Sequence, residues 1–285
     1  MARPLLTYIS SRGTVFNLHD FQSAKLYEAN FHKVEWIPET IKHQFGTTIT
    51  RFTKDPLIFE VSFRFKGSYN QRKQQIDDLM FAAEYDVSHQ KLGRICWNDE
   101  YIQVYFNVSD THPTDEGYTE IEGEFYAPYP FWIEEQRVQI RPSEEHEGGY
   151  PENVKGYDPS YPYEYAYPYA KTSTIITVDS ALDSNFKATI YGPTNDVTFS
   201  INAHVYKINH ALRTGQIMVL DTRQNIPLTD KIYIINEDGT RKNVFDYRDP
   251  DSDVFAKIPN GSVIINYTRT YGIDFDIFQE RSAPK

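Results

Sequence analysis

Residues Phe59–Lys66 read FEVSFRFK, and this short stretch decides the fold class. Its odd positions are apolar and its even positions are polar, which is the period-2 pattern of a β-strand with one buried face and one solvent face. Similar patterns recur in segments 101–108, 197–201, 217–220, 232–235, 263–267 and 273–277. Turn sequences such as Asp238-Gly239 and Asn260-Gly261 separate many of these segments. We therefore expect an all-β protein, mainly β with one helix.

The expected helix is the segment that departs from this alternation. Its apolar residues follow the i, i+3, i+4, i+7 spacing of a helix and are Ile76, Leu79, Met80 and Ala83. Ser68 or Asn70 can cap its start, because a short polar side chain accepts a hydrogen bond from the first turn. The spacing predicts a single helix near residues 70–86, packed against the first sheet.

Composition indicates a globular protein with a large share of aromatic residues. The chain has 285 residues, of which 15% are aromatic, with 22 Tyr and 18 Phe. Flat rings suit the pleated surface of a sheet and also suit protein interfaces. The single cysteine, Cys96, excludes an intrachain disulfide and a thiolate metal cluster. We find neither a signal peptide nor an apolar run of about 20 residues, and therefore expect a soluble protein made in a cytoplasm.

Charge is spread unevenly along the chain. The net charge of −11 argues against nucleic acid as a ligand, since phosphate groups repel an acidic surface. Residues 1–95 hold 13 Lys/Arg and 10 Asp/Glu, residues 96–165 hold 3 and 16, and residues 166–285 hold 13 and 14. The acidic middle beside a mildly basic first third can steer self-association. The alternative interpretation is a solvated acidic face that keeps the protein soluble.

A domain boundary is expected in the stretch 141–171. Prolines at 159, 162 and 168 disfavour a regular strand or helix there, and six tyrosines lie between 157 and 169. We predict an N-terminal β-sandwich domain of residues 1–136, a Tyr/Pro-rich connector of residues 137–171 and a C-terminal β-sandwich domain of residues 172–285. The connector either packs along one of the domains or is an idle linker.

The sequence predicts no catalytic, cofactor-binding or metal-ligating residue. Asp249–Asp253 resembles the start of a calcium loop, but Val254 and Asn260 stand where such a loop needs Gly and Glu. We interpret it as a solvated acidic turn. The neighbouring pairs Glu134/Glu135 and Glu144/Glu145 do not provide the two separated carboxylates of a glycosidase.

The densest aromatic cluster is Phe125–Trp132, which reads FYAPYPFW. Such a cluster can stack on a sugar, fill an interface or close a hydrophobic core at the end of a strand. We favour the third interpretation.

Several motifs together resemble the distal tail proteins of long-tailed, non-contractile bacteriophages, especially those infecting Gram-positive bacteria. The motifs are Tyr129–Trp132, Tyr161–Tyr165, Ile190–Pro193, Ile201-Asn202, Val205-Tyr206, Gly215–Thr222 and Val254–Gly261. They cover nearly the whole chain in the order and spacing of that family. Gln216 stands where the family pattern has Glu, and Ser262 where it has Asn; both substitutions leave the turns intact.

The resemblance implies a virion structural protein without enzymatic activity. It implies an N-terminal ring-forming β-sandwich, a C-terminal galectin-like β-sandwich and a homohexameric hub at the distal tail or baseplate, assembled in the host cytoplasm. The implied partners are the tail tube protein, the tail-tip or tail-associated lysin protein and, in many relatives, receptor-binding proteins. DNA would only pass through the ring, and neither a cofactor nor a membrane is implied.

Two other function classes remain open at this level. A carbohydrate-binding, lectin-like adhesion module could use stacked aromatic rings, although Trp36, Trp97 and Trp132 all lie in the first expected domain. A cell-wall hydrolase would need a carboxylate pair that one sequence does not reveal. A domesticated, phage-derived particle could carry the same ring.

Overall fold

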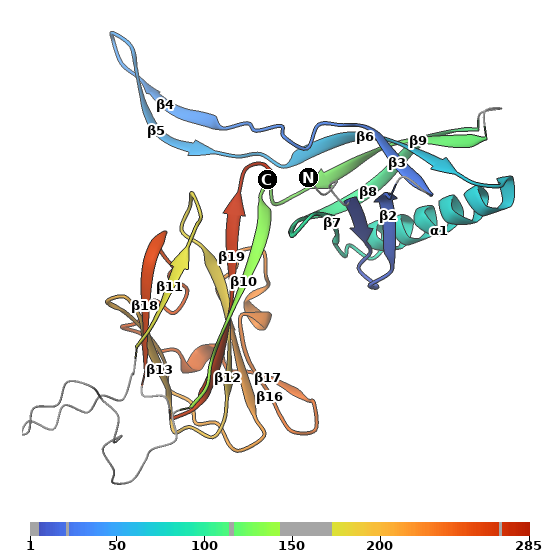
Figure 1. Ribbon diagram of the computed structural model, residues 1–285. Coiled ribbons are helices and arrows are strands. Elements are labelled where there is room, and N and C mark those ends of the chain that lie inside the picture. Colours follow the sequence, from blue (N-terminus) through green and yellow to red (C-terminus); the bar gives the residue numbers. More distant parts are fainter. Residues whose placement is uncertain (1–5, 21–22, 114–116, 143–172, 268–269) are drawn as a thin grey trace, which may run out of the picture. The chain divides into compact units, whose positions relative to one another are not determined.

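The computed structural model describes residues 6–20, 23–113, 117–142, 173–267 and 270–285 (Figure 1). The chain divides into two compact units, one of Met1–Glu135 with Glu280–Lys285 and one of Gln136–Gln279. The described strands pair in an antiparallel manner, and the described residues include one α-helix. The expectation of an all-β fold with one helix is therefore confirmed.

Unit 1 contains two antiparallel sheets that share one long strand. The first has the order β10-β8-β7-β1-β2 and the second the order β3-β6-β9-β8. The strands are β1 (Leu6–Ile9), β2 (Val15–His19), β3 (Ala24–Ala29), β6 (Leu57–Lys66), β7 (Gly93–Trp97), β8 (Glu100–Pro113), β9 (Tyr118–Ala127) and the start of β10 (Trp132–Ile140). The first half of β8 pairs with β7 and its second half with β9.

Strand β6 shows how the sequence sets the layers of this unit. Phe59, Phe63 and Phe65 of its odd positions are buried, while Glu60 of its even positions is exposed. The buried rings join an aromatic core in which Phe106 and Phe125 stack with their centroids 4.4 Å apart. Because the alternating apolar residues all point to one side of the strand, the other side is left to face solvent.

Helix α1 (Tyr69–Ser88) lies where the spacing predicts a helix, and it begins one residue before and ends two residues after the expected segment. Of the two expected caps, Ser68 is the one used: its side chain accepts a hydrogen bond from the backbone of Gln71, whose side chain accepts one in return. Ile76 and Leu79 are buried in the core of unit 1. The helix therefore packs on the sheets as expected.

A hairpin formed by β4 (Ile37–Lys42) and β5 (Thr47–Thr53) stands apart from both sheets of unit 1. Its two strands pair only with each other in the part of the chain that the structure describes. In Figure 1 it is the long pale-blue arm that extends from β6.

Unit 2 is a sandwich of two antiparallel sheets. One has the order β17-β16-β15-β12-β19 and the other the order β11-β18-β13-β14. Rings from both sheets meet in its core, where the centroids of Phe199 and Phe275 are 5.4 Å apart. The strands are β11 (Ser173–Val178), β12 (Asn185–Tyr191), β13 (Val197–Ile201), β14 (His204–Ile208), β15 (Ile217–Asp221), β16 (Ile232–Ile235), β17 (Arg241–Asn243), β18 (Gly261–Tyr267) and most of β19 (Gly272–Arg281). Two short 3-10 helices are η1 (Leu228–Asp230) and η2 (Phe245–Tyr247).

Strand β19 corrects one expectation from the sequence. Its alternation predicts a solvated polar face, but Asp274 and Asp276 are buried, so that prediction is wrong for this strand. Lys187 of β12 lies 2.7 Å from Asp276, and Arg137 of β10 lies 3.3 Å from it. Tyr191 donates a hydrogen bond to Asp274. Long side chains from the two neighbouring strands therefore cover the polar face and neutralise it.

Candidate functional site

The open face of the second sheet in unit 1 carries an unusual concentration of carboxylates. Glu60 of β6 lies directly opposite Glu124 of β9, and Glu122 of β9 lies opposite Asp110 of β8. Residues that face each other across an antiparallel pair point to the same side of the sheet. These acidic side chains are all exposed. We call Glu60, Asp110, Glu120, Glu122 and Glu124 the acidic face.

Few cations balance the acidic face. Arg64 pairs with Glu120 over 3.2 Å, and Ser62 donates a hydrogen bond to the same carboxylate. Within the described residues, no cation forms an ion pair with Glu60, Glu122 or Glu124. Like charges directly opposite each other on a sheet are destabilising. The arrangement is therefore poor for stability and calls for another explanation.

Sequence reasoning placed negative charge in the middle of the chain but missed this surface. The available signal was the alternation of Glu120, Glu122 and Glu124 with buried residues inside Tyr118–Ala127. Because a strand alternates its faces, three glutamates at every second position must share one side. That Glu60 and Asp110 join them depends on pairing between distant segments.

The aromatic cluster Phe125–Trp132 lies mainly in the core of unit 1, which confirms the favoured interpretation. Trp132 is fully buried, and its ring centroid lies 5.8 Å from that of Phe31. Tyr129 is half-buried and donates a hydrogen bond of 2.7 Å to Glu280. Burial, together with that carboxylate, raises the pKa of the Tyr129 hydroxyl above its usual value. The cluster therefore closes the core and leaves Tyr126 exposed.

Lys54 connects the base of the β4–β5 hairpin to this aromatic cluster. Its ammonium nitrogen lies 5.0 Å from the ring centroid of Trp36 and 4.6 Å from that of Phe131. It also donates a hydrogen bond of 3.2 Å to the carbonyl oxygen of Pro130. Burial lowers the pKa of Lys54. The side chain thus joins residues before and after the hairpin to a loop of the same unit.

Asp249–Asp253 forms a turn, as interpreted from the sequence. The side chain of Asp249 accepts a hydrogen bond from the backbone nitrogen of Asp251 over 3.0 Å, and it pairs with Lys207 over 2.8 Å. The hydrogen bond from Lys207 lowers the pKa of Asp249. In the described ranges, no three His, Cys, Asp or Glu side chains are gathered as metal ligands.

The carboxylates Glu134 and Glu135 serve separate contacts. Glu134 pairs with Lys285 over 2.7 Å, whereas Glu135 accepts a hydrogen bond of 2.7 Å from Tyr101. As neighbours on β10 they point to opposite faces. Glu144/Glu145 and the tyrosines of the stretch 157–169 lie outside the described residues. No helix in the described part of the chain has the length and hydropathy needed to cross a bilayer.

Comparison by sequence and comparison by structure give different results. No protein-family model matches the sequence, and no curated protein matches it. Solved structures do match. One is the crystal structure of the SPP1 Dit protein, described as a paradigm of the hub adsorption apparatus in phages that infect Gram-positive bacteria. It has a TM-score of 0.59 at 12% identity and covers 98% of this chain and 100% of that chain.

Two further matches come from the baseplate of phage p2 in its activated conformation, one with calcium and one with strontium. Their TM-scores are 0.60 and 0.62 at 12% identity, and each covers 99% of this chain and 100% of that chain. At an identity this low the matches establish the fold alone. Because they cover nearly the whole chain, the similarity in fold extends over both units. The resemblance to distal tail proteins indicated by the sequence motifs is thus confirmed at the level of the fold: the chain has the fold of SPP1 Dit and of a chain of the p2 baseplate.

Proposed function

We propose that this chain is a non-enzymatic structural protein that forms the hub at the distal end of a phage tail. The observation that carries the proposal is the structural match to SPP1 Dit and to the p2 baseplate over nearly the whole of each chain. A match over both units is more informative than one over a single β-sandwich, because sandwiches host many unrelated functions. The motif order in the sequence supports the same role.

The hub would be a homohexamer. Unit 1, close to the expected domain 1–136, would form the ring, and the expected domain 172–285 would be a galectin-like sandwich outside it. The ring would join the tail tube protein on one side to the tail-tip or tail-associated lysin protein on the other, and the outer domain would anchor receptor-binding proteins. A closed ring needs two different surfaces on each copy, one for each neighbour.

The acidic face suits the wall of a central opening through which DNA passes. Phosphate groups bind to surfaces rich in Lys and Arg and are repelled by carboxylates. A wall that carries Glu60, Glu122 and Glu124 would let DNA slide without gripping it. The loss of stability that comes from placing like charges opposite each other would then be a consequence of this role.

Light scattering of the purified protein across a concentration series tests the hub directly. A hexamer of the 33.3 kDa chain has a mass of about 200 kDa. Electron micrographs of that species should show rings with a central opening. A chain that stays monomeric at all concentrations would argue against the hub and favour a carbohydrate-binding module, which a glycan array would then test.

Charge reversal tests the role of the acidic face. The triple variant with Glu60→Lys, Glu122→Lys and Glu124→Lys should bind double-stranded DNA in a retardation assay at low salt, whereas the unaltered chain should not. A matched control reverses three exposed acids of unit 2, Asp230, Glu237 and Asp246, and so changes the net charge equally. If both variants bind DNA equally, the location of the acidic face has no special role.

A further inference from the structure

The β4–β5 hairpin exposes apolar side chains that nothing in the described chain covers. Phe45 at its tip is 88% exposed, and Ile41, Ile49 and Phe52 are each more than half exposed. Ile41 and Ile49 lie on opposite faces of the hairpin, so neither face packs on a core. A two-stranded hairpin without a layer beneath it is only marginally stable in water. The hairpin therefore calls for a partner surface.

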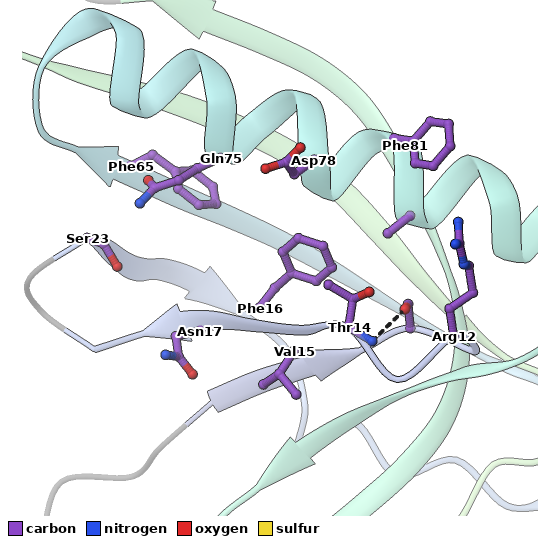
Figure 2. A pocket seen from close by; sticks show the side chains of 12 residues that line it. Arg12, Thr14, Val15, Phe16, Asn17, Ser23, Phe65, Gln75, Asp78 and Phe81 are labelled. Carbon is purple, nitrogen blue, oxygen red and sulfur yellow. Dashed lines mark hydrogen bonds between the residues drawn. The ribbon is translucent and has the colours of Figure 1, made fainter.

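A groove of about 520 Å³ in the same unit offers such a surface. It runs between helix α1 and strand β2 (Figure 2). Its apolar lining comes from three elements, with Val15 and Phe16 on β2, Phe65 on β6 and Phe81 on α1. Phe81 is 64% exposed and stands at the rim. Large exposed rings beside a groove are typical of interfaces.

Polar groups in the groove also lack partners. The side-chain oxygen of Gln75, which lines the groove, is buried and accepts no hydrogen bond. Strand β2 pairs with β1 along one edge, and no described strand pairs with its other edge. Residues Thr14–Asn17 line the groove, while β3 begins beside the other end of β2, where the backbone nitrogen of Leu26 donates a hydrogen bond to the ring of His19. Unpaired backbone groups at a sheet edge are a template for an incoming strand.

The hairpin and the groove lie at opposite ends of unit 1. In Figure 1 the hairpin extends away from the end of the unit that holds α1 and β2. The hairpin of one chain therefore does not fill its own groove. A contact between two different surfaces at opposite ends of a subunit is heterologous, and repetition of such a contact closes a ring when the rotation allows it.

The charges of the two surfaces are opposite in sign. The hairpin carries Lys42 and His43 near its tip, while Glu39 and Arg51 neutralise each other in an ion pair of 2.7 Å. Asp78 and the exposed cation Arg12 both line the groove, and α1 also exposes Asp77, Glu84 and Lys73. Three acids against two cations leave this surface with a small net negative charge. Opposite charges at an interface favour the correct orientation of approach.

We propose that the β4–β5 hairpin of one copy docks in the α1/β2 groove of a second copy of this chain. Phe45 and the apolar side chains beside it enter the groove, and one hairpin strand adds to the free edge of β2. This inference rests on the proposed hub function and assigns its ring interface to named surfaces.

Paired variants provide the test. Phe45→Asp disables the hairpin and leaves the groove intact, whereas Phe81→Asp disables the groove and leaves the hairpin intact. Each should reduce the mass measured by light scattering from that of the ring to that of one chain. Val15→Lys is a second groove variant at another exposed position. Leu228→Asp, an equally exposed apolar position in unit 2, is the matched control and should leave the ring intact.

Mixing the two disabled variants makes the test specific. The intact groove of the Phe45→Asp chain can accept the intact hairpin of the Phe81→Asp chain, but the other two surfaces are blocked. The mixture should therefore contain a species of twice the chain mass and nothing larger. Circular dichroism and urea unfolding of each variant check that both remain folded.

The outcomes separate this inference from the hub itself. A ring that survives either substitution overturns the inference and leaves the hub function standing. Two monomeric variants that do not combine on mixing also overturn it, because the two surfaces then do not meet. An unaltered chain that is monomeric throughout overturns the inference and removes the ring from the proposed function as well.

Discussion

Glu60 and Glu124 lie directly opposite each other on neighbouring strands of one sheet, and both are exposed. Two carboxylates in this position repel each other, and nothing in the described chain forms an ion pair with either. Asn107 of β8 stands on the other side of Glu124 and carries no charge. Stability alone would favour an opposite charge at one of these positions. The pair therefore lowers the stability of unit 1, which agrees with the role proposed for the acidic face.

Removing one charge of this pair should stabilise unit 1. Glu124→Gln keeps the shape of the side chain and ends its repulsion with Glu60, with an expected gain of about 0.2–1 kcal/mol. Urea unfolding at low salt measures this gain, which should shrink at high salt because exposed charges are screened. Glu237→Gln on unit 2 is the matched control. An equal gain from the control would show that only net charge matters.

The main elements of the fold could be predicted because their signals are local. Phe59–Lys66 alternates over eight residues, and Ile76 and Leu79 follow a helical spacing. Ile273–Ile277 alternates in the same way, yet both faces of that strand are buried. The difference comes from Lys187 and Arg137, which lie on strands far away in the sequence. Local periodicity shows that a strand has two faces, but it does not show what covers the second one.

The candidate site was only partly predictable for the same reason. Glu120, Glu122 and Glu124 share a face by alternation alone, but their placement beside Glu60 requires the register between β6 and β9. The return of Glu280–Lys285 to unit 1 is equally non-local. The groove between α1 and β2 also has no local signal, since residues before Ala24 and residues from Phe65 onward, more than forty positions apart in the sequence, together form its lining.

Tyr8 should make the stability of unit 1 sensitive to alkaline pH. It donates a hydrogen bond of 2.6 Å to buried Asp86, and burial together with that carboxylate raises its pKa. In the unfolded chain Tyr8 loses its proton near pH 10, whereas the folded chain keeps it. The contribution of Tyr8 to the free energy of unfolding is therefore fully present below about pH 10. It is lost as the pH rises above this value, because the unfolded state then binds fewer protons than the folded state.

Tyr8→Phe separates this contribution from the other tyrosines. At neutral pH the variant should be less stable by about 1.5–3 kcal/mol, since Asp86 loses a donor that is not replaced. Above about pH 10 its stability should decline less steeply than that of the unaltered chain. Urea unfolding from about pH 8 to about pH 11 compares the two slopes. Parallel slopes would show that Tyr8 ionises equally in both states.

Lys187 should be important for the buried polar face of β19. Lys187→Met keeps most of the apolar stem but removes the charge that lies 2.7 Å from Asp276. Arg137 remains on the other side of the carboxylate, so the expected loss is about 1.5–3 kcal/mol, the value of one charge-assisted hydrogen bond. Urea unfolding measures the loss in unit 2. The double variant Lys187→Met/Asp276→Asn should recover part of it, and no recovery would contradict the pairing.

Lys54 should stabilise the contact between the base of the β4–β5 hairpin and the loop that holds Pro130 and Phe131. Lys54→Met keeps an unbranched apolar side chain between Trp36 and Phe131 but removes the cation–π contacts and the hydrogen bond to Pro130. Contacts of this kind contribute about 0.5–2 kcal/mol, so the hairpin should open more often while the core stays folded. Trypsin should then cleave after Lys42 and Arg51 faster than in the unaltered chain.

This cleavage is to be measured below the concentration at which copies associate, because docking would protect the hairpin. Lys66→Met, an exposed lysine of β6 whose loss also removes one trypsin site, is the matched control and should leave the rate unchanged. Equal cleavage in all three chains would mean that the hairpin is held without Lys54. Faster cleavage together with a weaker ring would mean that the orientation of the arm, in addition to its apolar tip, determines whether neighbouring copies can join.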